Sequence, residues 1–208
     1  MSGAPPLLGL VLAGGRSERL GEDKAAVVHD GRPLLERAVA LAGTVVGHVL
    51  VAVRRDQVAD GLRGRFRLVI DEASGIGPAA GILAAHAAEP RAAWLVLACD
   101  LPWLEAGDLE QLVAARDPAQ DATAFRGARD GRPEPLCAIY EPATLARFQR
   151  TVASGGNANT SLRGWLESCR TVLLETQAID HFDSINTRQD LQRLMSAPAG
   201  GSSAPQPE

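Results

Sequence analysis

The chain has 208 residues, a formal net charge of −4, a hydrophobic fraction of 46% and an aromatic fraction of only 4%. This length suits one α/β domain with a single core. A core made mostly of Ala, Leu and Val favours helices packed on a buried parallel sheet. The weak negative charge excludes a surface with a general attraction for nucleic acid or anionic lipid, so we expect neither a nucleic-acid nor a membrane partner. Any site for a polyanion must therefore be local.

The cysteines and the amino-terminal segment bear on the compartment. Cys99, Cys137 and Cys169 lie far apart, and none belongs to a CxxC pair that would suggest zinc or a dithiol switch. No segment has the pattern of a signal peptide, and no apolar run approaches the ~18 residues that a membrane helix needs. We expect an unexported protein in the reducing cytoplasm.

Short apolar runs alternate with longer Ala- and Leu-rich segments along the chain. The pattern predicts strands at 8–12, 49–53, 68–70, 94–98, 122–125 and 172–174, and helices at 33–42, 78–88, 107–115, 142–153, 161–168 and 188–195. Between 125 and 141, a charged turn feeds the further apolar run PLCAIY. This rhythm predicts parallel βαβ units in an α/β fold: three αβα layers with a central, mostly parallel sheet and a Rossmann-like arrangement. We expect residues 1–196 to form a single domain and the Ala-, Pro-, Gly- and Ser-rich residues 197–208 to be a disordered tail.

The first predicted strand runs into the loop LAGGRSERLGEDKA, which places a loop where open parallel sheets bind their ligands. Gly14 and Gly15 can turn backbone N–H groups toward one point, and Arg16, Arg19 and Lys24 add positive charge. The spacing is neither that of a Walker A loop nor that of a dinucleotide fingerprint. The two glycines alone are equally typical of a plain turn, whereas their combination with the basic residues favours a phosphate site.

An acidic residue follows the most apolar run of the chain, in LVLACDLPWL. A carboxylate at the end of a buried strand is well placed to hold Mg²⁺ between protein and phosphate oxygens. A lone Asp before Leu-Pro is also typical of a turn or helix cap. Because the glycine loop follows a neighbouring strand, we favour the metal role for Asp100. Cys99 beside it has no evident base and is predicted to be a packed residue.

A second glycine-rich connection, VIDEASGIGPAAG, leads from a strand into the helix that begins at Pro78. Helix amino termini and N–H groups next to glycine suit a nucleotide, although an ordinary βα turn would have the same composition. Near the end of the chain, in FDSINTRQDL, Thr187 is placed to cap the helix predicted from Arg188.

These motifs together resemble those of the molybdenum cofactor guanylyltransferases, nucleotidyltransferases with a glycosyltransferase-A-like α/β fold. The family patterns are LAGGxSxRMGxDKA, DxxxGxGPLAGI, CDxP and NxNTPEDL, and this chain carries their counterparts in the same order from residue 7 to about residue 195. The resemblance implies that GMP is transferred from GTP to the terminal phosphate of molybdenum-bound molybdopterin, with release of pyrophosphate and with Mg²⁺ as the cofactor. It implies a nucleotide-binding first half and an acceptor-binding second half, and molybdoenzymes or their chaperones as recipients of the product.

The resemblance also assigns residues. The implied nucleotide-binding residues are Leu12, Ala13, Gly14, Gly15, Lys24, Asp71 and Asp100, of which Asp71 would contact the guanine nucleoside. The implied catalytic residues are Arg19, Lys24 and Asp100, and Asp100 would be the metal ligand. Asn186 would face the pterin, with Ser184 in place of a second asparagine, and a cap at Thr187 can hold at the same time.

Several positions depart from the family pattern. Leu20 replaces Met, Ala79 replaces Leu, and Arg188 replaces Pro. Arg54 stands where the family tends to have an asparagine that helps bind the nucleotide; it could stack on the base or bond its O6. Two alternatives therefore stay open: another nucleotidyltransferase of this fold, either a CTP-dependent molybdopterin cytidylyltransferase or a sugar-phosphate nucleotidyltransferase, and a non-catalytic cofactor-binding module.

Overall fold

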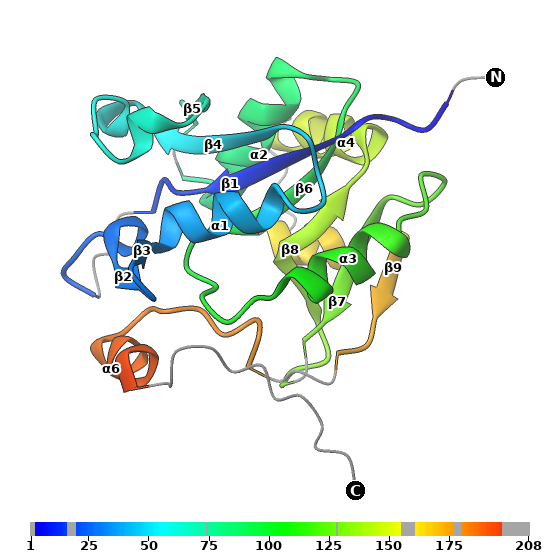
Figure 1. Ribbon diagram of the computed structural model, residues 1–208. Coiled ribbons are helices and arrows are strands. Elements are labelled where there is room, and N and C mark those ends of the chain that lie inside the picture. The colour runs from blue at the N-terminus through cyan, green and yellow to red at the C-terminus, as the bar shows by residue number, and fades with distance from the viewer. Residues whose placement is uncertain are drawn as a thin grey trace, which may run out of the picture.

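The computed structural model describes residues 3–15, 20–73, 75–127, 129–154, 161–176 and 180–196. Its centre is a seven-stranded sheet in the order β5-β4-β1-β6-β8-β7-β9 (Figure 1). The strands are β1 (Leu7–Leu12), β4 (Val49–Arg54), β5 (Leu68–Asp71), β6 (Ala93–Ala98), β7 (Ala122–Arg126), β8 (Pro133–Tyr140) and β9 (Thr171–Leu174). The helices are α1 (Leu34–Ala42), α2 (Pro78–Ala88), α3 (Ala106–Ala114), α4 (Pro142–Ala153), α5 (Leu162–Glu167) and α6 (Arg188–Ser196). The predicted tail, 197–208, lies outside the described residues.

Most of the sheet is parallel, as the sequence predicted. Strand β1 pairs in parallel with β4 and β6, β4 with β5, and β7 with β9. Strand β8 is the exception, because it runs antiparallel to both β6 and β7. The charged turn between 125 and 141 explains this reversal: β7 and β8 are joined as a hairpin, and a short hairpin connection can only give an antiparallel pair.

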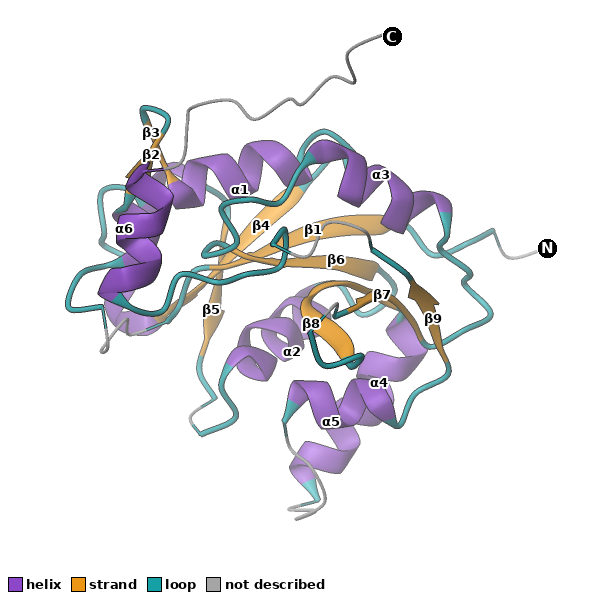
Figure 2. Cartoon of the chain, turned by 90° about the horizontal axis from the view of Figure 1, so that it is seen from below, coloured by secondary structure: helices purple, strands orange, loops and turns teal. Residues whose placement is uncertain are grey.

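Helices cover both faces of the sheet, which confirms the three-layer αβα arrangement (Figure 2). Side chains of α1 and α3, such as Leu35 and Leu109, join Val11 in one apolar cluster. Side chains of α2, α4 and α5 join Leu10 in a second cluster on the other face. Leu10 and Val11 are both fully buried, which follows from the alternation of side chains along a strand covered on both faces.

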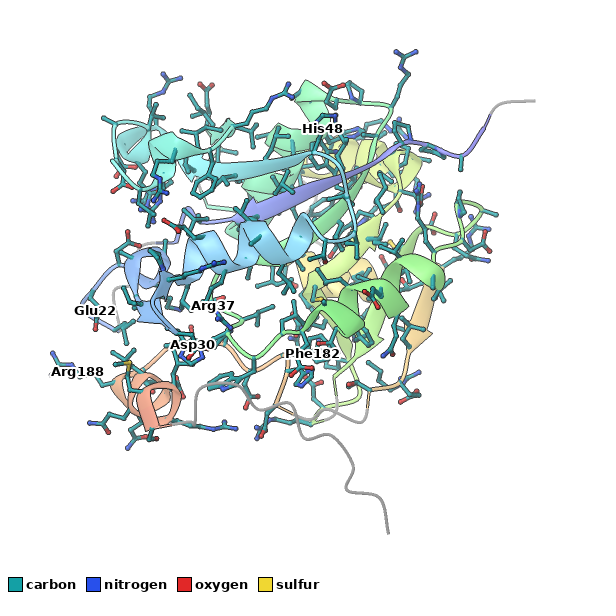
Figure 3. The ribbon with its side chains drawn as sticks, in the orientation of Figure 1. Glu22, Asp30, Arg37, His48, Phe182 and Arg188 are labelled. Carbon is teal, nitrogen blue, oxygen red and sulfur yellow. The ribbon has the colours of Figure 1, made fainter. Side chains whose placement is uncertain are left out.

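A small antiparallel ladder of β2 (Val28–His29) and β3 (Arg32–Pro33) precedes α1, and the sequence reading did not anticipate it. Its turn is the dipeptide Asp30-Gly31, in which both residues have positive φ, of 49° and 73°. An Asp-Gly pair is a hairpin signal, so the omission was avoidable. Asp30 also faces Arg37 of α1 at 3.4 Å, which ties the hairpin to the helix (Figure 3).

The last helix brings the end of the described chain back to its beginning. Ile185 and Leu194 pack with Leu20, Val27 and Leu34 in a third apolar cluster. Figures 1 and 2 show α6 beside the β2–β3 hairpin, at the edge where the loop after β1 emerges. The carboxyl-terminal segment is thereby placed against the opening loop.

No helix in the described part of the chain is long and apolar enough to cross a membrane.

Candidate active site

A cavity of about 720 Å³ opens at the carboxyl ends of β1, β4, β5 and β6. This is the edge at which open parallel sheets bind ligands. Seven residues of the predicted nucleotide site line it: Leu12, Ala13, Gly14, Gly15, Lys24, Asp71 and Asp100. The structure therefore gathers in one cavity residues that the sequence spreads over nearly ninety positions.

Lys24 and Asp100 meet at one end of the cavity. Lys24 Nζ donates to Asp100 Oδ2 at 2.9 Å, and the two side chains are only 17% and 19% exposed. Lys24 begins the short 3-10 helix η1 (Lys24–Ala26), and Asp100 follows β6, so secondary structure fixes both residues. The partly shielded pair presents one positive and one negative group side by side, which suits a phosphate and the cation that accompanies it.

The segment before α6 reaches this pair. Asn186 Oδ1 accepts from Lys24 Nζ at 2.6 Å, and Ser184 Oγ accepts from Asn186 Nδ2 at 2.6 Å. The backbone N–H of Ile185 donates to the carbonyl of Asp100 at 3.0 Å. The two residues predicted to face the acceptor, Asn186 and Ser184, therefore adjoin the two residues predicted to serve the triphosphate.

The cap predicted at Thr187 is present as well. Thr187 Oγ1 accepts from the N–H of Asp190 at 3.2 Å, and Asp190 Oδ2 accepts from the N–H groups of Thr187 and Asn186 at 2.7 and 2.9 Å. This reciprocal arrangement is a capping box in function. It orients the backbone of Asn186, so capping and a site role for Asn186 are compatible.

The other end of the cavity holds charged groups from β4 and β5. Arg54 and Asp71 are the last residues of these strands and lie opposite each other in the ladder. The guanidinium of Arg54 donates from Nη1 to the carbonyl of Gly14 and from Nε and Nη2 to both carboxylate oxygens of Asp56, at 3.0 and 3.1 Å. The pKa of Asp71 is raised, chiefly because burial disfavours its charged form, while an N–H of Ala73 and the charge of Arg54 act in the opposite direction. Arg54 therefore lines the cavity, and its guanidinium is held in place by hydrogen bonds to Gly14 and Asp56.

The glycines of the cavity serve two different purposes. Gly75 and Gly77 have φ of +84° and +56°, which L side chains rarely adopt, and they lead into α2 at Pro78. Gly14 and Gly15 do not have positive φ; a Cβ on Gly15 would meet nothing within 4 Å, and one on Gly14 would make only ordinary contacts. Positive φ therefore does not require glycine at either position in this conformation, and the role of their N–H groups in binding phosphate stays a prediction. Their small size leaves room in the cavity instead.

Two buried charged residues near the site were not found from the sequence. Arg63, which is 2% exposed, donates to the carbonyl of Ala13 and to the carboxylate of Asp23, at the two ends of the opening loop. Glu134 of β8 is 13% exposed at its side chain, and burial raises its pKa, with the negative charge of nearby Asp100 adding to the effect. An acid inside the apolar run of β8 was a visible signal, whereas Arg63 lies in an arginine-rich connection that reads as solvated surface.

Arg19 lies outside the described residues, so its predicted role stays a prediction. Cys99 is buried, and burial raises the pKa of its thiol to about 12, which agrees with a packed residue and not a nucleophile. His86 is 4% exposed, and its Nδ1 has no hydrogen-bond partner among the described residues.

The donor set near Asp100 fits one kind of metal site. Among the described residues, no group of three or more His, Cys, Asp or Glu could enclose a metal ion. Mg²⁺ commonly binds through one or two carboxylates while water and substrate phosphates fill its other positions. A single carboxylate at the cavity floor beside Lys24 fits an ion shared with a phosphate, and does not fit a closed cage of protein ligands.

Comparison with known proteins agrees with the fold and identifies the family. Residues 9–172 match the model of the family described as "MobA-like NTP transferase domain". The chain is 32% identical over 198 residues to the "Probable molybdenum cofactor guanylyltransferase" of Natronomonas pharaonis, covering 89% of this chain and 95% of that one. It is 30% identical over 189 residues to the "Molybdenum cofactor biosynthesis bifunctional protein" of Synechocystis, covering 91% of this chain but only 54% of the relative, so it spans about half of that protein.

Among solved structures, the molybdopterin-guanine dinucleotide biosynthesis protein A of Archaeoglobus fulgidus superposes with a TM-score of 0.72 at 26% identity, covering 89% of this chain and 95% of that one. The similarity thus extends over nearly the whole of both chains. The chain belongs to the family of MobA-like NTP transferase domains and is, by that membership, a nucleotidyltransferase.

Proposed function

We propose that this protein transfers GMP from GTP to the terminal phosphate of molybdenum-bound molybdopterin, releases pyrophosphate, and requires Mg²⁺. The observation that carries the proposal is the Lys24–Asp100 pair, with Asn186 joined to it, at one end of a cavity whose other end holds Arg54 and Asp71. The names of the relatives in Natronomonas and Synechocystis supply the substrate class.

The order of the strands sets the direction of the nucleotide. Asp71 on β5 and Asp100 after β6 are separated by β4 and β1. Three strand spacings of ~4.8 Å make this roughly 14 Å, enough for a base, a ribose and the first phosphate. The base is assigned to the β4–β5 end and the triphosphate to the loop after β1, with the amino terminus of α2 facing the cavity between them.

The proposed chemistry needs no general base. The attacking oxygen belongs to a phosphate that is already ionised at neutral pH, so the residues have to reduce repulsion between two anions and stabilise charge on the departing pyrophosphate. Lys24 neutralises phosphate oxygens, and Asn186 holds its ammonium from the acceptor side. When bound, Mg²⁺ supplies charge neutralisation between phosphate oxygens, with Asp100 as its protein ligand. Each such contact in a shielded site contributes ~2 to 4 kcal/mol to lowering the barrier.

Asp71 is proposed to select guanine. Guanine offers two hydrogen-bond donors, N1–H and the exocyclic amine, and a carboxylate accepts both. Cytosine offers a single amine, and a partly buried acceptor left without its partner costs ~1 to 3 kcal/mol. The guanidinium of Arg54 is already hydrogen-bonded to Gly14 and Asp56. We therefore propose that Arg54 lines the base site and does not donate a hydrogen bond to O6 of guanine.

The test is a panel of GTP, CTP, ATP and UTP with Mg²⁺, measured as thermal stabilisation and then as pyrophosphate release with molybdopterin as acceptor. GTP is expected to stabilise most and to support turnover. Asp71→Ala should weaken the binding of GTP by about 10-fold and leave the binding of CTP nearly unchanged. Tighter binding of CTP in the unaltered protein would make it a cytidylyltransferase of the same fold. Nucleotide binding without pyrophosphate release would favour a cofactor-binding module.

A further inference from the structure

Arg63 fastens both ends of the opening loop. Its Nε and Nη2 donate to the carbonyl of Ala13 at 3.2 and 3.0 Å, and its Nη1 and Nη2 donate to Oδ2 and Oδ1 of Asp23 at 2.6 and 2.9 Å. Ala13 follows β1 and Asp23 immediately precedes Lys24. One planar guanidinium therefore sets the distance between the point where the loop leaves the sheet and the point where it delivers the lysine.

The Arg63 side chain is itself fixed. It is 2% exposed and is the largest buried charged side chain in the described part of the chain. Its backbone N–H donates to Asp60 Oδ1 at 2.8 Å, and Asp60 Oδ1 lies 3.4 Å from Arg63 Nη1. Asp23 is also the N-cap of η1, where its Oδ1 accepts from the N–H of Ala25 at 3.2 Å. The contacts continue without a gap from the connection before β5 to the first residue of η1.

We propose that Arg63 is a positioning residue for the nucleotide triphosphate: by holding Ala13 and Asp23, it presents the loop and Lys24 in the geometry that binds phosphate. The inference rests on the proposed function only in requiring a nucleoside triphosphate, whatever its base. Holding Ala13 and Asp23 in place before the ligand arrives removes an ordering cost from binding, so the effect of Arg63 is expressed as affinity. Arg63 does not line the cavity and acts through the residues that it holds.

Arg63→Lys is the informative substitution, because an ammonium keeps the charge but cannot bond two carboxylate oxygens and a carbonyl in one plane. Arg116 provides a matched control. It donates to both oxygens of Glu141 at 2.6 and 3.1 Å and to the carbonyl of Pro5 at 2.9 Å, so it likewise joins a carboxylate to a backbone carbonyl, away from the cavity. Arg116→Lys should lower the melting temperature as Arg63→Lys does, without touching the site.

The experiment measures melting temperature, KM for the nucleotide, KM for the acceptor and kcat in both variants, using the nucleotide that stabilises the unaltered protein most. We expect KM for the nucleotide to rise about 10-fold or more in Arg63→Lys and to stay unchanged in Arg116→Lys, with the acceptor KM unchanged in both. Asp23→Asn keeps the shape and the cap of η1 but loses the charge, and it should raise the nucleotide KM in the same direction. When Asp23→Asn is combined with Arg63→Lys, the nucleotide KM should rise little further, because both substitutions break the same contact between Arg63 and Asp23.

Unchanged nucleotide KM in Arg63→Lys, with a melting temperature lowered as in Arg116→Lys, would make Arg63 a purely structural residue and overturn the inference. If Arg63→Lys does not fold, Asp23→Asn decides the matter by the same split between nucleotide and acceptor KM. A preference for CTP would contradict the guanylyl proposal and leave this test intact.

Discussion

At the scale of single residues, the site is organised around one ammonium group with acceptors on two sides. Lys24 Nζ donates to Asp100, the proposed metal ligand, and to Asn186, which is proposed to face the acceptor. A charge held at two points keeps its place when the phosphate arrives, which reduces the reorganisation that the reaction requires. Asp100 is also the proposed protein ligand of Mg²⁺, so we expect its loss to lower turnover more than folding stability.

Asp100→Asn is predicted to lower Mg²⁺-dependent pyrophosphate release by about 100-fold or more. The amide keeps the size of the side chain and a hydrogen-bond acceptor for Lys24, but it is a poor ligand for a hard cation. Turnover at saturating Mg²⁺, together with the melting temperature, checks the prediction. Glu22→Gln is the control, since Glu22 is an exposed acid of the same loop (Figure 3). Near-normal turnover in Asp100→Asn, still dependent on Mg²⁺, would exclude Asp100 as the metal ligand.

Arg54 shows what a single sequence could not settle at this scale. The residue type allowed stacking on the base or a bond to O6, and both readings treat the guanidinium as available. In the structure, the guanidinium donates hydrogen bonds to Asp56 and to the carbonyl of Gly14. Asp56 is only two positions away, so one partner was local, but the contact with Gly14 exists only because β4 lies beside β1.

At the scale of elements, the loops that follow the strands position many of the residues that line the cavity. The connection from β5 to α2 turns through Gly75 and Gly77, and Gly77 is the N-cap of α2 with φ of 56° and ψ of −136°. This conformation is essentially reserved for glycine. The amino terminus of α2 therefore faces the cavity only as long as residue 77 lacks a Cβ.

Gly77→Ala is predicted to lower the free energy of unfolding by ~1 to 3 kcal/mol and to weaken nucleotide binding, because the strain must be relieved by moving the start of α2. Gly107→Ala in α3 is the matched control. A Cβ on Gly107 would meet nothing within 4 Å, its φ is not positive, and the residue is exposed in the first turn of the helix. Alanine there should be neutral or stabilise by up to ~1 kcal/mol. Denaturant unfolding and nucleotide titration of both variants give the comparison; equal effects would contradict the assignment of strain to Gly77.

At the scale of the whole molecule, Asp121 joins parts that the chain keeps far apart. It lies just before β7 and is 6% exposed. Its Oδ1 accepts from Arg147 of α4 at 2.9 Å, and its Oδ2 accepts from the N–H of Arg170, next to β9, at 2.9 Å. These bonds, the one from Arg147 first, lower the pKa of Asp121 from 3.8 to about 2. The carboxylate thus connects β7 and the edge strand β9 with a helix on one face.

This shift makes a prediction for acid stability. Because the folded pKa is lower than the unfolded one, the stabilisation is complete above about pH 4 and is lost as the pH falls toward 2. Asp121→Asn should lower the free energy of unfolding by ~1 to 2 kcal/mol at neutral pH and flatten its decline with acid in that window. Urea unfolding at a series of pH values measures it. As a control, Glu110→Gln at an exposed position should leave the dependence of the unfolding free energy on pH unchanged. If Asp121→Asn also leaves the decline of the unfolding free energy in acid unchanged, Asp121 does not contribute to acid stability.

What the sequence determined by itself was the local pattern. Strands and helices are recognisable from alternating apolar runs, because a buried parallel strand must be apolar throughout, and α2 and α4 begin and end at the predicted residues. The site residues Gly14, Lys24, Asp71 and Asp100 were identified as loop or strand-end residues, because parallel strands bring their carboxyl ends to one edge.

What only the tertiary structure decided was which distant groups meet. Arg63 reads as one of several arginines in a solvated connection, and its burial follows from the packing of that connection beneath the loop after β1. The approach of Asn186 to Lys24 depends on the packing of Ile185, before α6, and of Leu194, in α6, against Leu34. Pattern and propensity act over a few residues, whereas these contacts join positions tens to more than a hundred residues apart, and only the packed core fixes their distances.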